Sequence, residues 1–345
     1  MFICIGPGNG IKTGQSRCFE VFKNRLEFIC ISSGGEGLKL LTKILIMLTG
    51  IIKLIYFMAF NYGSIQSVLI SISRTRIGFI KDMPFFVICF LLRKNTYIHL
   101  HGNDFDKFYS SLFSFERYVV RLILMKAKGI LIPNLFMSKQ FDGIISGVPF
   151  HLVPNFHMSS FSKVDASYKN QMLYLSNIMV EKGIFHVLDI FDIIRREIVD
   201  VELTIVGSMM LPVELEKKFR TLIENRNIGY VERVNPDDVF RFYRDSDILL
   251  FPSCYETEAS PLVLLEAMNA SCVPFTFRHN NIEEVLADSI KQSTKKKSSK
   301  DLARKILDSL TSKQQLSYLK SSNFEKAEEY SIDNYTNRII EILGK

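Results

Sequence analysis

Two carboxylates that flank a predicted helix start are the groups in this chain best placed to bind a substrate. Glu258 and Glu266 stand eight positions apart, with Ser260 and Pro261 between them. Ser260 suits the N-cap of a helix and Pro261 its first residue. The first N–H groups of such a helix, those of Leu262 and Val263, have no intrahelical acceptor and suit a phosphate. Neighbouring carboxylates accept hydrogen bonds from sugar hydroxyls.

The apolar run Ile248–Phe251 precedes this segment and predicts a buried strand, which Pro252 and Ser253 end. A helix that starts at the carboxyl end of a strand is a usual ligand site in parallel α/β sheets. A plainer interpretation is that both carboxylates only favour the helix start, where negative charge is stabilising. That interpretation fits Glu258, but Glu266 lies beyond the first helical turn.

The string from Ile248 to Met268 resembles the E-x7-E motif of retaining, nucleotide-sugar-dependent GT-B glycosyltransferases, glycosyltransferase family 4, of the bacterial surface-polysaccharide type. The resemblance implies that Glu258 contacts the transferred sugar and that Glu266 holds the ribose hydroxyls of the nucleotide. It is strong from about Met172 to Ala287 and looser in the first half of the chain.

A second segment, Tyr174–Gly183, resembles the part of that family in which an Arg and a Lys neutralise the nucleotide diphosphate. Lys182 matches the Lys. Asn177 stands at the Arg position, which removes one positive charge and leaves only an uncharged hydrogen-bond donor. After Cys272–Thr276 the family usually carries two glycines, whereas this chain has Arg278-His-Asn-Asn.

Two elements of the first half are also site candidates. The glycine-rich segment around Gly10 is similar to the opening loop of bacterial polysaccharide glycosyltransferases, but it matches neither a nicotinamide fingerprint nor a P-loop. His99 and His101 lie on one side of a predicted strand, and no third metal ligand is evident. The resemblance implies that His101 faces the donor sugar, whereas His99 is interpreted as a core residue.

Composition bounds the remaining possibilities. The chain has 345 residues, 47% hydrophobic and 23% charged, which fits two globular domains. Its net charge of +7 favours acidic partners without choosing among membranes, phosphates and nucleic acid. The six cysteines form no Cys-x-x-Cys pair, so we expect free thiols in a reducing cytoplasm.

Strand-like and helix-like runs alternate along the chain and predict an α/β fold with two Rossmann-like domains facing across a cleft. We expect an N-terminal acceptor-side domain over 1–156, a linker over 157–171, a nucleotide-sugar domain over 172–322 and a C-terminal helix within 323–345 that crosses back to the first domain. The strands are expected at Phe2–Gly6, Leu26–Ile31, Ser67–Ser71, Thr96–Leu100, Gly129–Ile132, His151–Val153, Met172–Leu175, Glu202–Val206, Gly229–Val231, Ile248–Phe251 and Cys272–Thr276. The basic stretch Gln292–Lys300 is expected to be a solvated loop.

The apolar stretch Leu38–Phe60 is interrupted by Lys39, Lys43 and Lys53, which argues against a transmembrane helix. An amphipathic helix with a basic edge and a partly buried helix of an α/β domain remain as alternatives.

The sequence thus predicts a retaining glycosyltransferase of the hexosyltransferase type, with a UDP- or GDP-sugar donor and a bacterial polysaccharide or lipid-linked glycan acceptor. It implies no metal cofactor and no nucleic-acid partner. We expect a cytoplasmic protein involved in polysaccharide biosynthesis. We also expect it to attach peripherally to the anionic inner face of the plasma membrane. The alternatives are a sugar-nucleotide epimerase on the same fold, a degenerate sugar-nucleotide-binding scaffold, and a basic protein that coats nucleic acid or membrane.

Overall fold

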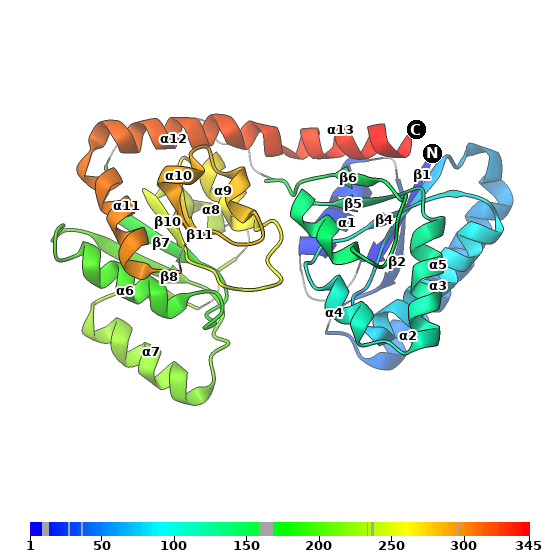
Figure 1. The fold of residues 1–345 in the computed structure, drawn as a ribbon, viewed down its shortest axis with the longest axis horizontal. Helices are drawn as coiled ribbons and strands as arrows, with labels where there is room; N and C mark the ends of the chain where they lie inside the picture. Colours follow the sequence, from blue (N-terminus) through cyan, green and yellow to red (C-terminus); the bar gives the residue numbers. More distant parts are fainter. Residues whose placement is uncertain are drawn as a thin grey trace. The chain divides into compact units, whose positions relative to one another are not determined.

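The structure, a computed structural model, describes residues 1–8, 14–26, 28–35, 37–158, 168–232, 234–235, 238–295 and 297–345. The chain forms two units (Figure 1). Unit 1 contains Met1–Pro154 and Asp333–Lys345, and unit 2 contains Asn155–Ile332.

In the described part of unit 1, a parallel sheet has the order β2-β1-β3-β4-β5-β6. Its central strands are uninterrupted apolar runs such as Ile3–Ile5, buried on both faces, as parallel sheets require. The strands are β1 (Phe2–Pro7), β2 (Phe28–Gly34), β3 (Ser67–Ser71), β4 (Asn95–His99), β5 (Gly129–Ile132) and β6 (Phe150–Leu152).

The helices of unit 1 form two layers. They are α1 (Gly14–Arg25), α2 (Leu40–Asn61), α3 (Arg76–Leu91), α4 (Phe105–Ser110), α5 (Ser114–Lys126) and α13 (Ile332–Leu343). The crossover helices α2, α3 and α5 lie on one face of the sheet (Figure 1). On the other face, α13 packs against α1 by stacking Tyr335 on Phe22, with ring centroids 6.0 Å apart.

In unit 2 the described strands form a second parallel sheet, ordered β12-β11-β10-β7-β8-β9. The strands are β7 (Gln171–Leu175), β8 (Glu202–Val206), β9 (Gly229–Val231), β10 (Ile248–Phe251), β11 (Val273–Phe277) and β12 (Ser293–Thr294). The helices are α6 (Ile184–Ile194), α7 (Val213–Asn225), α8 (Val239–Arg244), α9 (Leu262–Asn269), α10 (Ser289–Gln292), α11 (Ser299–Thr311) and α12 (Lys313–Ala327). The buried stripe of α6, which includes Val187 and Phe191, packs into the core of this unit.

Two expectations from the sequence are wrong in detail. The last helical segment is two helices, because α12 ends at Ala327 and a 3₁₀ turn, Glu328–Tyr330, precedes α13. The stretch from Gln292 to Thr294 is buried rather than solvated. Ser293 and Thr294 pair with β11, and the Gln292 amide donates a hydrogen bond of 3.0 Å to the Pro274 carbonyl, which satisfies the buried polar group.

Candidate functional site

The strand order of unit 2 reverses direction between β7 and β10. The chain runs outward from β7 through β8 to β9, and then returns to place β10 on the other side of β7. The connections that leave the carboxyl ends of β7 and β10 therefore lead to strands on opposite sides, β8 and β11, and this is where open parallel sheets bind ligands. Lys182 follows β7 and Glu258 follows β10, so the two predicted residues come from the two loops at this point.

The two loops are held in close contact by their backbones. The N–H of Cys254 donates a hydrogen bond of 2.7 Å to the Glu181 carbonyl. Gly183 has a φ of +81°, and a side chain there would meet the backbone of Pro252. Only glycine meets both requirements, so Gly183 sets the position of Lys182 beside the loop that follows β10.

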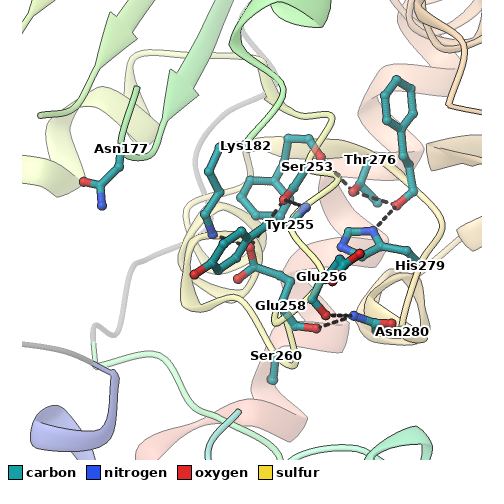
Figure 2. Close-up of polar contacts among 12 residues, drawn as sticks. Asn177, Lys182, Ser253, Tyr255, Glu256, Glu258, Ser260, Thr276, His279 and Asn280 are labelled. Carbon is teal, nitrogen blue, oxygen red and sulfur yellow. Dashed lines mark hydrogen bonds and ion pairs between the residues drawn. The ribbon is translucent and has the colours of Figure 1, made fainter. Parts of the chain in front are cut away.

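Lys182 and Glu258 form an ion pair between Nζ and Oε2 (Figure 2). Their side chains are 14% and 12% exposed, so the pair is largely shielded from solvent but not sealed. The ammonium of Lys182 also lies 4.7 Å from the centre of the Tyr255 ring, a cation–π contact that fixes its direction. The hydroxyl of Ser253 lies 3.4 Å from the same Oε2 of Glu258.

The loop after β11 supports the Glu258 segment. The side-chain amide of Asn280 donates to the carbonyls of Glu256 and Glu258, at 2.7 and 3.0 Å (Figure 2). Asn280 and Asn281 have φ values of 51° and 59°, in the left-handed region that asparagine tolerates best after glycine. Asparagines with left-handed backbone angles thus occupy the segment in which the resembled family usually carries two glycines.

Helix α9 starts one residue later than the sequence predicted. Pro261 takes the N-cap position, Leu262 is the first helical residue, and Val263 follows it. Ser260 therefore does not cap the helix: its backbone carbonyl accepts a hydrogen bond of 2.6 Å from the Asn155 amide. The Ser260 hydroxyl oxygen is buried and has no hydrogen-bond partner among the described residues.

Glu266 lies on α9 and is 6% exposed. The hydroxyl of Tyr243 donates a hydrogen bond of 3.0 Å to its Oε2. Tyr243, on α8, was not singled out from the sequence; its only signal was its place in a partly apolar helix. The carboxylate is thus held in one orientation, and its role toward a ribose stays a prediction.

Two further residues, Asn177 and His279, lie near the Lys182–Glu258 ion pair without contacting it. Asn177 is exposed and points away from Lys182 and Glu258 (Figure 2). His279, which sequence reasoning passed over, has Nδ1 3.4 Å from the Phe277 carbonyl. Burial lowers its pKa, although the nearby Glu258 carboxylate acts in the opposite direction.

The site candidates of the first half belong to unit 1. Gly10 lies outside the described residues. His99 and His101 have ring centroids 3.9 Å apart, which agrees with their predicted common side. Burial lowers the pKa of both, that of His99 to about 3, so both rings are neutral at pH 7. Arg74 forms an ion pair with Asp104 beside them, and its guanidinium fills the space above Gly102.

Within unit 2 the structure therefore brings together a cation, a carboxylate, a buried hydroxyl and a helix start. A cation and free helical N–H groups stabilise an anion, and a positioned carboxylate orients hydroxyls. Among the described residues, no group of three or more His, Cys, Asp or Glu side chains is arranged to hold a metal ion.

Comparison with known proteins gives one family match and many similar folds. Residues 159–326 match the family model described as glycosyl transferases group 1. No curated protein matches the chain. Anabaena Alr3699/HepE, solved in complex with UDP and glucose, is 10% identical with a TM-score of 0.73, and the alignment covers 100% of this chain and 99% of that one.

Two further structures show the same fold. A glycosyltransferase from Rickettsia africae ESF-5 is 14% identical with a TM-score of 0.74, covering 99% of this chain and 97% of that one. A variant of S. aureus TarM in complex with Fondaparinux, alpha-GlcNAc-glycerol and UDP is 13% identical with a TM-score of 0.63. The alignment covers 86% of this chain and 59% of that one. The α/β prediction with two Rossmann-like units is confirmed. Residues 159–326 therefore match a domain of the glycosyl transferases group 1 type, and the chain as a whole has the GT-B fold of the similar structures.

Proposed function

We propose that the protein is a retaining hexosyltransferase that moves a sugar from a UDP- or GDP-sugar to a hydroxyl of a bacterial surface polysaccharide or lipid-linked glycan. The observation that carries the proposal is the Lys182–Glu258 pair at the point where the strand order of unit 2 reverses. The similar structures from Anabaena and S. aureus, both solved with UDP, favour a nucleotide-sugar donor.

The phosphate side of the site rests on Lys182 and the start of α9. A lysine ammonium has three N–H donors, so Lys182 can bind Glu258 and still donate to diphosphate oxygens. The buried Ser260 hydroxyl and the first N–H groups of α9 supply further donors, and the helix dipole adds positive potential. Asn177, exposed in the same loop, offers only an uncharged donor. We assign the neutralisation of the diphosphate to these groups and to no metal ion.

The sugar side rests on the two carboxylates. Among the described residues, the contacts of the Glu258 carboxylate are made by Oε2, which leaves Oε1 to orient a sugar hydroxyl. Glu266, held by Tyr243, is assigned to the ribose hydroxyls. His101 of unit 1 is assigned to the donor sugar, as a neutral ring that can donate or accept a hydrogen bond.

In the proposed reaction the bond between the anomeric carbon and the diphosphate oxygen breaks, and the oxygen keeps the electron pair. The acceptor hydroxyl forms the new bond to the anomeric carbon on the same face and gives its proton to the leaving phosphate. Lys182 and the α9 N–H groups stabilise the charge that develops on the leaving group, which is where donors accelerate such a reaction most.

The test is nucleoside diphosphate release from a panel of UDP- and GDP-sugars, with and without glycan acceptors, together with NMR of the product anomer. Glu258→Gln should lower turnover about 100-fold or more, as expected for a group in the reaction centre. Glu256→Gln is the matched control, because Glu256 is an exposed carboxylate in the same loop. Equal activity in the two variants would contradict the assignment.

The panel also separates the alternatives. Diphosphate release that needs no acceptor would support the sugar-nucleotide epimerase. Donor binding in calorimetry without any turnover would support the non-catalytic scaffold. An inverted product anomer would refute the retaining mechanism.

A further inference from the structure

The outer surface of helices α2, α3 and α5 in unit 1 is apolar where a soluble protein is usually polar. Helix α2 packs on the sheet through a narrow stripe, Gly50, Leu54 and Met58. A second stripe on the same helix is exposed. It consists of Leu41, Leu45, Leu48, Ile52, Ile55 and Phe60, with Leu41 81% and Phe60 73% exposed. From Leu41 to Ile55 the spacing of three and four residues places these side chains on one face of the helix, and Phe60 follows five residues later.

The same double pattern occurs on α3 and α5. Both helices bury one stripe and expose another at helical spacing. The exposed residues are Ile77, Ile80, Val87 and Leu91 on α3, and Phe115, Tyr118, Leu122 and Met125 on α5. Three helices with a second apolar stripe are more than the scattered exposed apolar residues that any surface carries.

The three helices are neighbours, so their stripes belong to one surface. Gly50 of α2 lies against the Phe85 ring of α3, where an added Cβ would be 3.2 Å away. Arg76 of α3 donates a hydrogen bond of 2.6 Å to Glu116 of α5. The helices form the layer on one face of the unit 1 sheet (Figure 1). We call this outer surface the apolar face.

The charges around the apolar face are almost all positive. From residue 37 to residue 81 the sequence contains no acidic residue. Within the three helices the acidic residues are Asp82, which is buried beside Lys81, and Glu116, which is paired with Arg76. Exposed basic residues surround the stripes: Lys39, Lys53, Arg93, Arg117, Arg121 and Lys126.

This combination selects the occupant. A second copy of the chain would bring one positive rim against another, because a two-fold interface pairs each patch with itself. An anionic lipid surface instead supplies apolar chains for the stripes and negative headgroups for the rim.

The length of α2 does not require that it cross the bilayer. Among the described residues, one helix, Leu41–Ser64, is long and apolar enough by length and composition to do so, with 17% of its most apolar window buried. Crossing would strip Gly50, Leu54 and Met58 from the sheet, and an added Cβ at Gly50 would lie 2.7 Å from the Ser32 carbonyl oxygen, so the packing there is close. The helix therefore lies parallel to the surface.

We propose that the apolar face is a membrane-docking surface that inserts the exposed stripes of α2, α3 and α5 into the headgroup and upper acyl region of an anionic bilayer. Its basic rim binds the phosphates of the lipid headgroups. This inference rests on unit 1 alone and holds whichever sugar or acceptor the enzyme uses.

The test is flotation of the full-length protein with vesicles of phosphatidylglycerol and phosphatidylcholine, and with vesicles of phosphatidylcholine alone. We expect binding to the anionic vesicles, weakened by salt. Ile52→Glu and Phe115→Glu should each lower the partition coefficient about tenfold or more, because each places a charge among inserted side chains. Lys53→Gln should lower it about fivefold, the contribution of one basic residue near an anionic surface. Val199→Glu is the matched control, since Val199 is a 90% exposed apolar residue of unit 2.

Three outcomes would overturn the proposal. They are no vesicle binding by the wild-type protein, equal losses in Val199→Glu and Ile52→Glu, and a concentration-dependent dimer in light scattering that Ile52→Glu abolishes while vesicle binding persists. Transfer to a soluble acceptor provides a separate readout. If Ile52→Glu loses vesicle binding but keeps that transfer, docking is supported independently of the reaction. If the wild type binds vesicles but transfers no sugar, only the proposed function fails.

Discussion

Replacing Gly183 with alanine tests whether the contact between the two loops of unit 2 builds the site. An ideal Cβ on Gly183 would lie 2.8 Å from the carbonyl carbon of Pro252, and its oxygen is nearer still. Ordinary contacts of a Cβ begin at 3.4 Å, so the loops must separate by at least about 0.6 Å. Residues with a φ of +81° also carry a conformational cost that glycine avoids.

The chain offers a control that isolates the clash. Gly147 has a φ of +80°, but a Cβ there would meet nothing within 4 Å. Gly147→Ala therefore carries only the backbone cost, about 1–2 kcal/mol. Gly183→Ala carries that cost and about 1–3 kcal/mol of overpacking, for a total of roughly 2–5 kcal/mol.

Urea unfolding gives the total loss, and hydrogen exchange assigns each loss to its own unit. Because Gly183 sets the position of Lys182, Gly183→Ala should also reduce turnover about tenfold to a hundredfold, as small displacements of reacting groups do. Gly147→Ala should leave turnover unchanged. If the two variants lose equal stability and equal activity, the contact with Pro252 does not position the site.

Three further outcomes are expected. Burial lowers the pKa of His99 to about 3 and also lowers the pKa of His101. Below about pH 6.5 both histidines are therefore protonated in the unfolded chain but stay neutral in the folded protein. The free energy of unfolding is thus highest above that pH and decreases as the pH falls, by up to about 1.4 kcal/mol per pH unit for each ring. His99→Gln should flatten this dependence in urea titrations at several pH values, and an unchanged slope would refute the argument. Asn280→Gly keeps the left-handed conformation but removes the two hydrogen bonds to the Glu258 loop. Turnover should therefore fall more than about tenfold, while the free energy of unfolding changes by less than about 2 kcal/mol. Wild-type turnover in this variant would contradict the supporting role of Asn280. Lys320→Met leaves the fully buried Asp247 carboxylate without its cation and should cost about 3–5 kcal/mol in chemical denaturation, whereas Lys326→Met, at an exposed ion pair, should cost less than about 1 kcal/mol; equal losses would show that burial does not matter here.

The sequence predicted much of the fold because its signals are local. Buried parallel strands are uninterrupted apolar runs, and Ile248–Phe251 was bounded correctly from that pattern and the following Pro252. The buried residues of α6, such as Val187 and Phe191, likewise recur at helical spacing. The helix break after Ala327 was missed because neither glycine nor proline marks it. The burial of Gln292–Thr294 was missed because these residues are polar. Their sequence does not reveal that β11 offers them a strand edge and that the Pro274 carbonyl accepts a hydrogen bond from the Gln292 amide.

The candidate site residues could be named one by one from the sequence, but their arrangement could not. Lys182 and Glu258 are far apart in sequence, and only the strand order and the contact between Gly183 and Pro252 bring them together. The sequence showed only that glycines are absent after β11, whereas in the structure Asn280 and Asn281 adopt the left-handed conformation and Asn280 also supports the Glu258 loop. The support of the Glu258 loop by Asn280 depends on backbone angles, which the amino-acid sequence alone does not reveal.

The return of α13 to unit 1 has a consequence for how the protein is made. The Ser67 hydroxyl, at the start of the central strand β3, donates a hydrogen bond of 2.6 Å to the carbonyl of Leu343. A ribosome must therefore synthesise all of unit 2 before α13 can join α1 and complete the cover of this face of the first sheet. At the usual rate of elongation that interval is on the order of ten seconds or more, during which the apolar surface that α13 will cover is exposed in the nascent first half.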